Sequence, residues 1–137
     1  FVPVSQRGPM LPWLSIWLLV TGAAGLFSSL QGFFKPGFLS KSMYPNVPQM
    51  PHVFERLFAT WTLVTTAVRC TCALYLEGNP QLYFVCLCTY VAALLHFSLE
   101  TFVFKTVSVA KGMMPFVIAS VSLVWMLSEY EQNTLML

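Results

Sequence analysis

Four long apolar blocks, separated by shorter polar segments, make up most of the chain. They cover residues 12–34, 53–76, 80–104 and 112–127. The first three contain 23 to 25 residues each, so as helices they would be about 34–38 Å long. A bilayer has a hydrocarbon core about 30 Å thick, which a slightly tilted helix of this length crosses. The pattern predicts an all-α fold, a bundle of four transmembrane helices forming one domain over residues 1–137.

The segments between the blocks differ in length. Residues 77–79 form a tight turn, which joins its two flanking spans into an antiparallel hairpin, and residues 105–111 are also short. Residues 35–52 instead form a loop of 18 residues with four prolines, and loops of that length are usually functional or disordered. Its contact-forming side chains favour a docking arm for a partner over a plain linker: Phe38, Leu39, Met43, Tyr44 and Met50.

The fourth block is the shortest and contains a proline. In a helix that begins at Gly112, Pro115 lies in the first turn, where its missing N–H costs little. We therefore expect the last span to be a regular helix that begins just before the proline.

Composition agrees with a membrane environment. The 137 residues are 57% hydrophobic and only 9% charged, against about 25% charged in an ordinary soluble domain. The net charge of +2 and the lack of a basic run give no indication of nucleic-acid binding. The first block is too long for the apolar core of a signal peptide, so we expect it to be retained as a span. The lipid bilayer is the predicted surrounding of the chain.

Most positive side chains fall at one predicted face of the membrane: Lys35, Lys41, Arg56, Lys105 and Lys111. The other face has Arg7 and three glutamates. The positive-inside rule then places the long loop in the cytosol, or in the matrix if the protein is mitochondrial. Both termini are expected together on the opposite side.

Small residues recur along one face of the first span. They are Thr21, Gly25, Ser28 and Gly32. Such stripes let helix backbones approach closely in lipid, where hydrophobic burial does not drive association. The stripe is predicted to contact either the chain's own helices or a partner.

Four cysteines flank the tight turn symmetrically, at Cys70, Cys72, Cys86 and Cys88. Two residues that are two positions apart on a helix point in nearly opposite directions, so two regular helices cannot aim all four thiols at one metal. Thiolate ligands would also need compensation that an apolar site lacks. We interpret them as small buried thiols that pack between helices, with a disulfide across one facing pair as the alternative.

A polar seam is predicted between the second and third spans. In an antiparallel hairpin that turns near Gly78, Arg56 lies opposite Glu100. One turn deeper, Thr60 lies opposite His96. An ion pair with a neighbouring hydrogen bond would be tolerated at that depth, whereas either charge alone would be costly. The seam would fix the register of the hairpin.

Chemical activity has little support in the sequence. His96 and Glu100 share a helix face that could ligate a metal, contact a quinone or relay protons, but the only other histidine is His52 in the loop. There is no aspartate and no glycine-rich phosphate-binding motif. Arg69 lies about 10 Å inside its span and could extend to the membrane surface. We predict no catalysis and no cofactor or metal, with a small redox or quinone protein as a third hypothesis.

Three stretches of the chain resemble the ergosterol biosynthesis protein 28 family of small endoplasmic-reticulum membrane proteins. They are "RLFATWTLVTTAVRCTCALYL", "LLHFSLETFVFKT" and "SLVWMLSEY", and the resemblance covers about residues 55–130. It implies a non-catalytic scaffold that holds the enzymes of sterol C-4 demethylation together in the endoplasmic-reticulum membrane. The first loop is longer and richer in proline than in the family, which leaves an alternative: a structural subunit of a respiratory complex in the mitochondrial inner membrane. Either way the expected partners are other integral membrane proteins.

Overall fold

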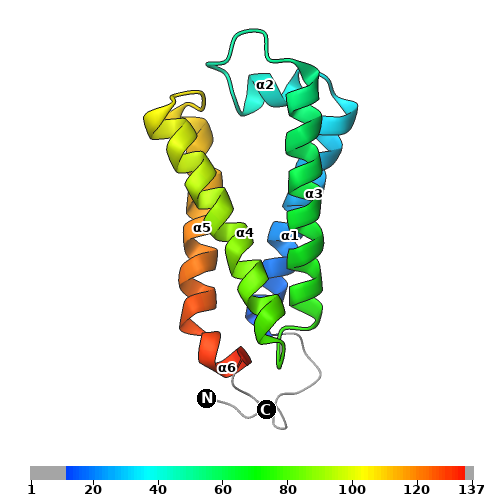
Figure 1. Cartoon of the computed structure of the whole chain (residues 1–137), viewed down its shortest axis with the longest axis vertical. Helices are drawn as coiled ribbons and strands as arrows, with labels where there is room; N and C mark the ends of the chain where they lie inside the picture. The colour runs from blue at the N-terminus through cyan, green and yellow to red at the C-terminus, as the bar shows by residue number, and fades with distance from the viewer. Residues whose placement is uncertain (1–11, 135–137) are drawn as a thin grey trace.

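Residues 12–134 are described by the computed structural model, in which four helices are long and apolar enough to cross a membrane. The spans are α1 (Trp13–Phe34), α3 (His52–Leu74), α4 (Pro80–Ser98) continued by the π-helical turn η2 (Leu99–Val103), and α5 (Val109–Ser128). Two short helices, α2 (Phe38–Ser42) and α6 (Tyr130–Thr134), lie at opposite ends of the bundle (Figure 1). The predicted all-α fold with four spans is confirmed.

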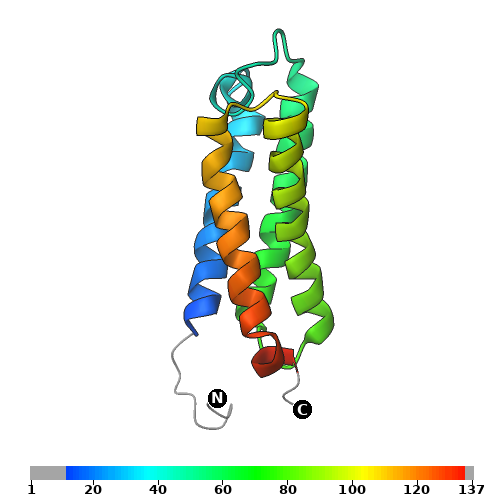
Figure 2. The ribbon, with the colours of Figure 1, turned by 90° about the vertical axis from the view of Figure 1, so that its left-hand side faces the viewer.

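The four spans form two antiparallel pairs. The closest packing is between α1 and α3, followed by that between α4 and α5, and the two pairs meet near α6 and diverge towards α2 (Figure 1). The beginning of α1 and the end of α6 lie at the same end of the bundle, and the loop that carries α2 lies at the other end (Figure 2). The molecule is therefore a wedge that is open towards the positively charged face.

Glycines allow α1 and α3 to approach closely. A Cβ added at Gly22 would lie 2.7 Å from the sulfur of Cys70, and one added at Gly32 would lie 2.8 Å from the Cβ of Ala59. In lipid, such backbone proximity is a main source of helix association. The predicted small-residue stripe therefore contacts a helix of the chain itself, at Gly25 and Gly32.

The other two members of that stripe have different neighbours. Thr21 is buried and its hydroxyl lies 2.6 Å from that of Tyr90 on α4, whereas Ser28 is half-buried beside a cavity. Gly22 and Ser29, which do not belong to the predicted stripe, are also buried in α1. The contact face of α1 is thus rotated slightly from the prediction.

Polar bonds close the narrow end of the wedge. Tyr83 donates a hydrogen bond of 2.5 Å to the carbonyl of Met126, and Trp17 donates one of 2.8 Å to the hydroxyl of Ser122. The N–H of Gly78 in the hairpin turn donates to the carbonyl of Asn133 in α6, at 2.9 Å. The bond of Tyr83 holds α4 to α5, and the bond of Trp17 joins α1 of one pair to α5 of the other.

The expected position of Pro115 in the first turn of its helix is wrong. α5 begins at Val109, where the side chain of Ser108 accepts a hydrogen bond from the N–H of Lys111, so Pro115 lies inside the helix. It cannot donate to the carbonyl of Lys111. A serine cap and a lysine at the membrane face both suit the first turn of a helix, so the helix begins three residues before Gly112.

Replacing Gly32 by alanine tests the α1–α3 contact. We expect Gly32→Ala to destabilise the fold by about 1–3 kcal/mol through overpacking, although alanine favours an isolated helix by about 1 kcal/mol over glycine. The reciprocal change Ala59→Gly in the same chain should restore part of the loss, since it removes the group that the new Cβ meets.

The stability of both variants is measured as the midpoint of unfolding in mixed detergent micelles, which is followed by circular dichroism. Ala23→Val, on an exposed position of the same helix, is the control and should be nearly neutral. An unchanged midpoint for Gly32→Ala would show that the helices are free to separate at this point.

Candidate functional site

The long loop at the open end of the wedge is folded onto the chain's own helices. Leu39 and Tyr44 are buried in a cluster with Phe97 and Val107, and partly buried Met43 and Met50 pack against it. The side chain of Phe38 is 39% exposed. Most contact-forming residues of the predicted docking arm therefore fix the loop to the bundle, and Phe38 is the one among them whose side chain is exposed.

A buried carboxylate at the start of α3 holds the first part of the loop. Glu55 is 1% exposed, and its two oxygens accept hydrogen bonds from the backbone N–H of Gly37 at 2.9 Å and of Ser40 at 3.1 Å. Nδ1 of His52 lies 2.8 Å from the same carboxylate. Gly37 has a φ of 83°, a conformation that glycine adopts without strain. Glu55 therefore satisfies the free N–H groups at the beginning of α2.

Glu55 was missed among the ionisable residues predicted to matter. It lies in the first turn of its span, where acidic residues are common because they suit the helix N-terminus. The available signal was His52 three residues earlier on the same face, next to a loop with unsatisfied backbone groups.

A second anchor joins the middle of the loop to α4. The hydroxyl of Tyr44 lies 2.7 Å from Nε2 of His96. Burial and the nearby charge of Glu100 raise the pKa of the Tyr44 phenol above its ordinary range, so the hydroxyl stays protonated and can donate to a neutral imidazole. Glu100 itself accepts a hydrogen bond from the hydroxyl of Thr106. The polar groups of α4 and η2 thus hold the two loops at this face.

The predicted seam between Arg56, Thr60, His96 and Glu100 does not form. Arg56 and Thr60 are exposed, and the Thr60 hydroxyl donates to the carbonyl of Arg56 on its own helix. Within residues 12–134 no ion pair joins Arg56 to Glu100. Arg56 and Thr60 lie on the exposed side of α3, and the side chain of α3 that contacts His96 is Trp61, whose ring centroid lies 5.5 Å from that of the imidazole. The hydrogen bond to His96 comes from Tyr44 of the loop.

The pairing expected for an antiparallel hairpin that turns near Gly78 does hold close to the turn, where α3 and α4 are near each other. Cys72 and Cys86 are fully buried in the same hydrophobic cluster. One turn away from the hairpin turn, Arg69 lies opposite Thr89 and donates to its hydroxyl at 3.1 Å. Cys70 is half-buried and Cys88 is exposed, and all four cysteines are free thiols. In the described part of the chain, no three metal-ligating side chains gather into a candidate site.

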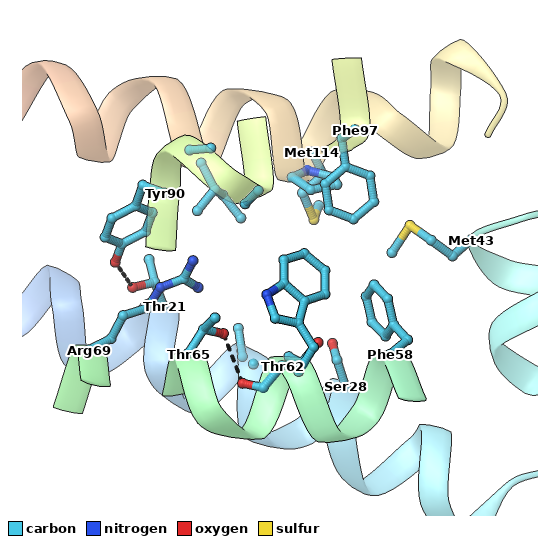
Figure 3. A pocket seen from close by; sticks show the side chains of 17 residues that line it. Thr21, Ser28, Met43, Phe58, Thr62, Thr65, Arg69, Tyr90, Phe97 and Met114 are labelled. Carbon is cyan, nitrogen blue, oxygen red and sulfur yellow. Dashed lines mark hydrogen bonds between the residues drawn. The ribbon is translucent and has the colours of Figure 1, made fainter. Parts of the chain in front are cut away.

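The sequence suggested that Arg69 could extend to the membrane surface, but its side chain instead stays inside the bundle. It is 9% exposed, and its guanidinium carbon lies 4.1 Å from the centre of the Tyr90 ring. A cavity of about 200 Å³ adjoins it between the two helix pairs (Figure 3). A wider groove of about 580 Å³ lies beside the loop, lined by residues that include Tyr44, Trp61 and His96.

Taken together, the fold is that of a helical membrane protein whose described polar groups mostly hold helices and loops in place. The family model of Erg28 like protein matches residues 14–124. Ergosterol biosynthetic protein 28 of Schizosaccharomyces pombe is 36% identical over 129 residues, which cover 92% of this chain and 93% of the relative. The protein of that name in Saccharomyces cerevisiae is 33% identical, over 89% of this chain and 83% of the relative. The human ergosterol biosynthetic protein 28 homolog is 34% identical, over 83% and 82%.

The chain belongs to the Erg28 family, a family of sterol biosynthesis, as the sequence resemblance indicated. No solved structure matches it. The alternative role in a respiratory complex of mitochondria finds no support in these relatives, which are named for ergosterol biosynthesis.

Glu55→Gln should loosen the loop without disturbing the spans. The amide has one acceptor oxygen in place of two, so one of the N–H groups at the beginning of α2 loses its partner, at a cost of about 1–3 kcal/mol. Hydrogen exchange of residues 37–44 should accelerate, while exchange in the interior of α3 stays the same. Arg56→Gln, at the exposed neighbouring position, is the matched control. Equal exchange in both variants would remove Glu55 as the anchor.

Proposed function

We propose that this protein is a non-catalytic scaffold that holds sterol-biosynthesis enzymes together in the endoplasmic-reticulum membrane. The enzymes of sterol C-4 demethylation are the expected partners, because the resemblance in α3, α4 and α5 implies them. The relatives' names support the pathway. The fold supports this mode of action, since four helices can anchor the chain in the membrane and the folded loop between α1 and α3 forms a surface at one end.

The observation that carries this proposal is the anchored loop at the positively charged face. A scaffold must present a surface of constant shape, because a flexible segment loses conformational entropy when it binds. Glu55 and His96 hold the loop from two sides, and Asn46 donates to the carbonyl of Lys105 at 3.0 Å. The loop thereby joins three spans into one platform.

The outer side of this platform suits a protein partner. Phe38 projects an aromatic ring that Lys35 approaches to 5.5 Å, and Lys41 is exposed next to it. Aromatic side chains are enriched in the cores of interfaces, and the rims of interfaces are polar. The positive-inside rule places this surface in the cytosol, within reach of enzymes with cytosolic domains.

The lack of catalysis is supported by the use of the acid–base groups. Glu55 binds backbone N–H groups, His96 pairs with a phenol that stays protonated, and Glu100 accepts from Thr106. Each group has a structural partner that a general acid or base would have to give up.

Co-purification tests the scaffold. The full chain, tagged and extracted in mild detergent, should recover membrane enzymes of sterol biosynthesis, quantified by mass spectrometry. Phe38→Ser combined with Lys41→Ser should reduce that recovery at least about tenfold, because it removes the exposed ring and charge but leaves buried Leu39 and Tyr44 in place.

The matched control carries Tyr75→Ser and Gln81→Ser, two exposed positions at the opposite end of the bundle. It should recover partners as well as the unaltered chain does. Equal recovery by the loop variant would exclude the loop as the partner surface, and an unaltered chain that recovers no sterol enzyme would refute the scaffold.

A further inference from the structure

Arg69 is a buried cation without a buried counter-charge. Two of its N–H groups donate to Thr89, to the hydroxyl at 3.1 Å and to the carbonyl at 3.4 Å. Its remaining contact is with the face of the Tyr90 ring. In the part of the chain from 12 to 134, no carboxylate pairs with it. A guanidinium has five N–H donors, so several are left for another acceptor.

Its depth makes this arrangement costly. Arg69 lies five residues before the end of α3 at Leu74, which is about 8 Å inside the span. Charges within membrane spans are rare and typically mark a pathway, a ligand or a partner charge. Thr89 and Tyr90 orient the guanidinium but do not neutralise it.

The cavity beside Arg69 is elongated and mostly apolar away from the charge. Figure 3 shows Arg69 and Tyr90 at one end and Phe58, Met43 and Phe97 towards the other. Its volume of about 200 Å³ exceeds that of an engineered cavity of about 150 Å³ that binds benzene. It therefore has room for a polar head and a ring-sized apolar portion, but not for a whole lipid.

The cavity also reaches the surface that faces lipid. Its wall includes Ala24 and Met114, which are exposed on α1 and α5, the latter by 71%. The bond between Trp17 and Ser122 ties these two helices only near the narrow end. The rest of a long ligand can therefore leave the cavity sideways into the bilayer.

We propose that this cavity binds a membrane amphiphile through a carboxylate that pairs with Arg69. A planar carboxylate matches the paired N–H groups of a guanidinium and supplies the missing negative charge. The phosphate of a phospholipid remains at the membrane surface with its headgroup, whereas a carboxylate on a slender apolar body can enter the span. A fatty acid and a sterol acid share this chemistry.

Photolabelling of the purified full chain tests the proposal. The chain is placed in nanodiscs of neutral phosphatidylcholine with a diazirine-bearing palmitic acid or a diazirine-bearing sterol carboxylate, each compared with its methyl ester. Either acid should label peptides that line the cavity at least about tenfold more than its ester, because only the acid forms a charge-assisted pair. The acid with the stronger labelling identifies the lipid class.

Three variants assign the labelling to the site. Arg69→Gln should lower labelling by the acid to the level of the ester, while Ala93→Phe should lower both because it fills the cavity and retains the charge. Arg56→Gln, the same change at an exposed position of the same helix, should leave labelling unchanged. Thermal unfolding of each variant shows whether it is folded.

Two results would overturn the proposal. One is equal labelling of the cavity by acid and ester in the unaltered chain. The other is preferential labelling by the acid that persists in folded Ala93→Phe, which would place the ligand elsewhere. Neither result depends on co-purification of sterol enzymes, so this inference and the scaffold are tested separately.

Discussion

The close contact between α1 and α3 is the constraint on which the rest of the structure depends. Glycines at positions 22, 25 and 32 bring the two backbones together along most of their length. In lipid this packing replaces the hydrophobic effect as the force that joins helices. With α3 packed against α1, α4 packs mainly against α5, and the two pairs come closest at the end near α6 (Figure 1). The wedge, its cavity and the space filled by the loop all follow from this pairing.

Polar groups have different tasks at the two ends of the wedge. At the narrow end, Tyr83 and Trp17 each make one bond that ties helix to helix. At the wide end, Glu55 and His96 each bind the loop through a hydrogen bond, while the ring of Trp61 on α3 contacts the imidazole of His96 on α4. The buried side chains of the loop complete the core between the diverging spans, and its outer side is the surface that we propose for partners.

Arg69 lies at the transition between these two regions. The hairpin helices are still close enough there for a direct bond to Thr89, yet one turn further the cavity begins. A cation at this position is held in place by its own chain and lacks a counter-charge from it. If both proposals hold, a scaffold that binds a membrane carboxylate at Arg69 would couple its assembly to the lipids around it.

The sequence by itself determined the family and the bounds of the four spans to within a few residues. It also indicated that the first and the last helix have their outer ends on the same side. Long apolar blocks and the charges of the loops suffice for this, because they hardly depend on how the helices pack. The small-residue stripe was also predictable, because close helix contact in lipid requires it. Tertiary structure alone decided the partner of each polar side chain. The pairing expected for an antiparallel hairpin located Cys72 near Cys86 but gave Thr60 as the partner of His96, whereas His96 contacts Trp61 and Tyr44. Sequence spacing fixes the level of a residue along a hairpin but not the side of the helix that faces the other helix. Contacts between residues far apart in sequence decided the rest: glycines of α1 bring α3 close, Tyr44 of the loop binds His96, and residues of all four spans line the cavity beside Arg69.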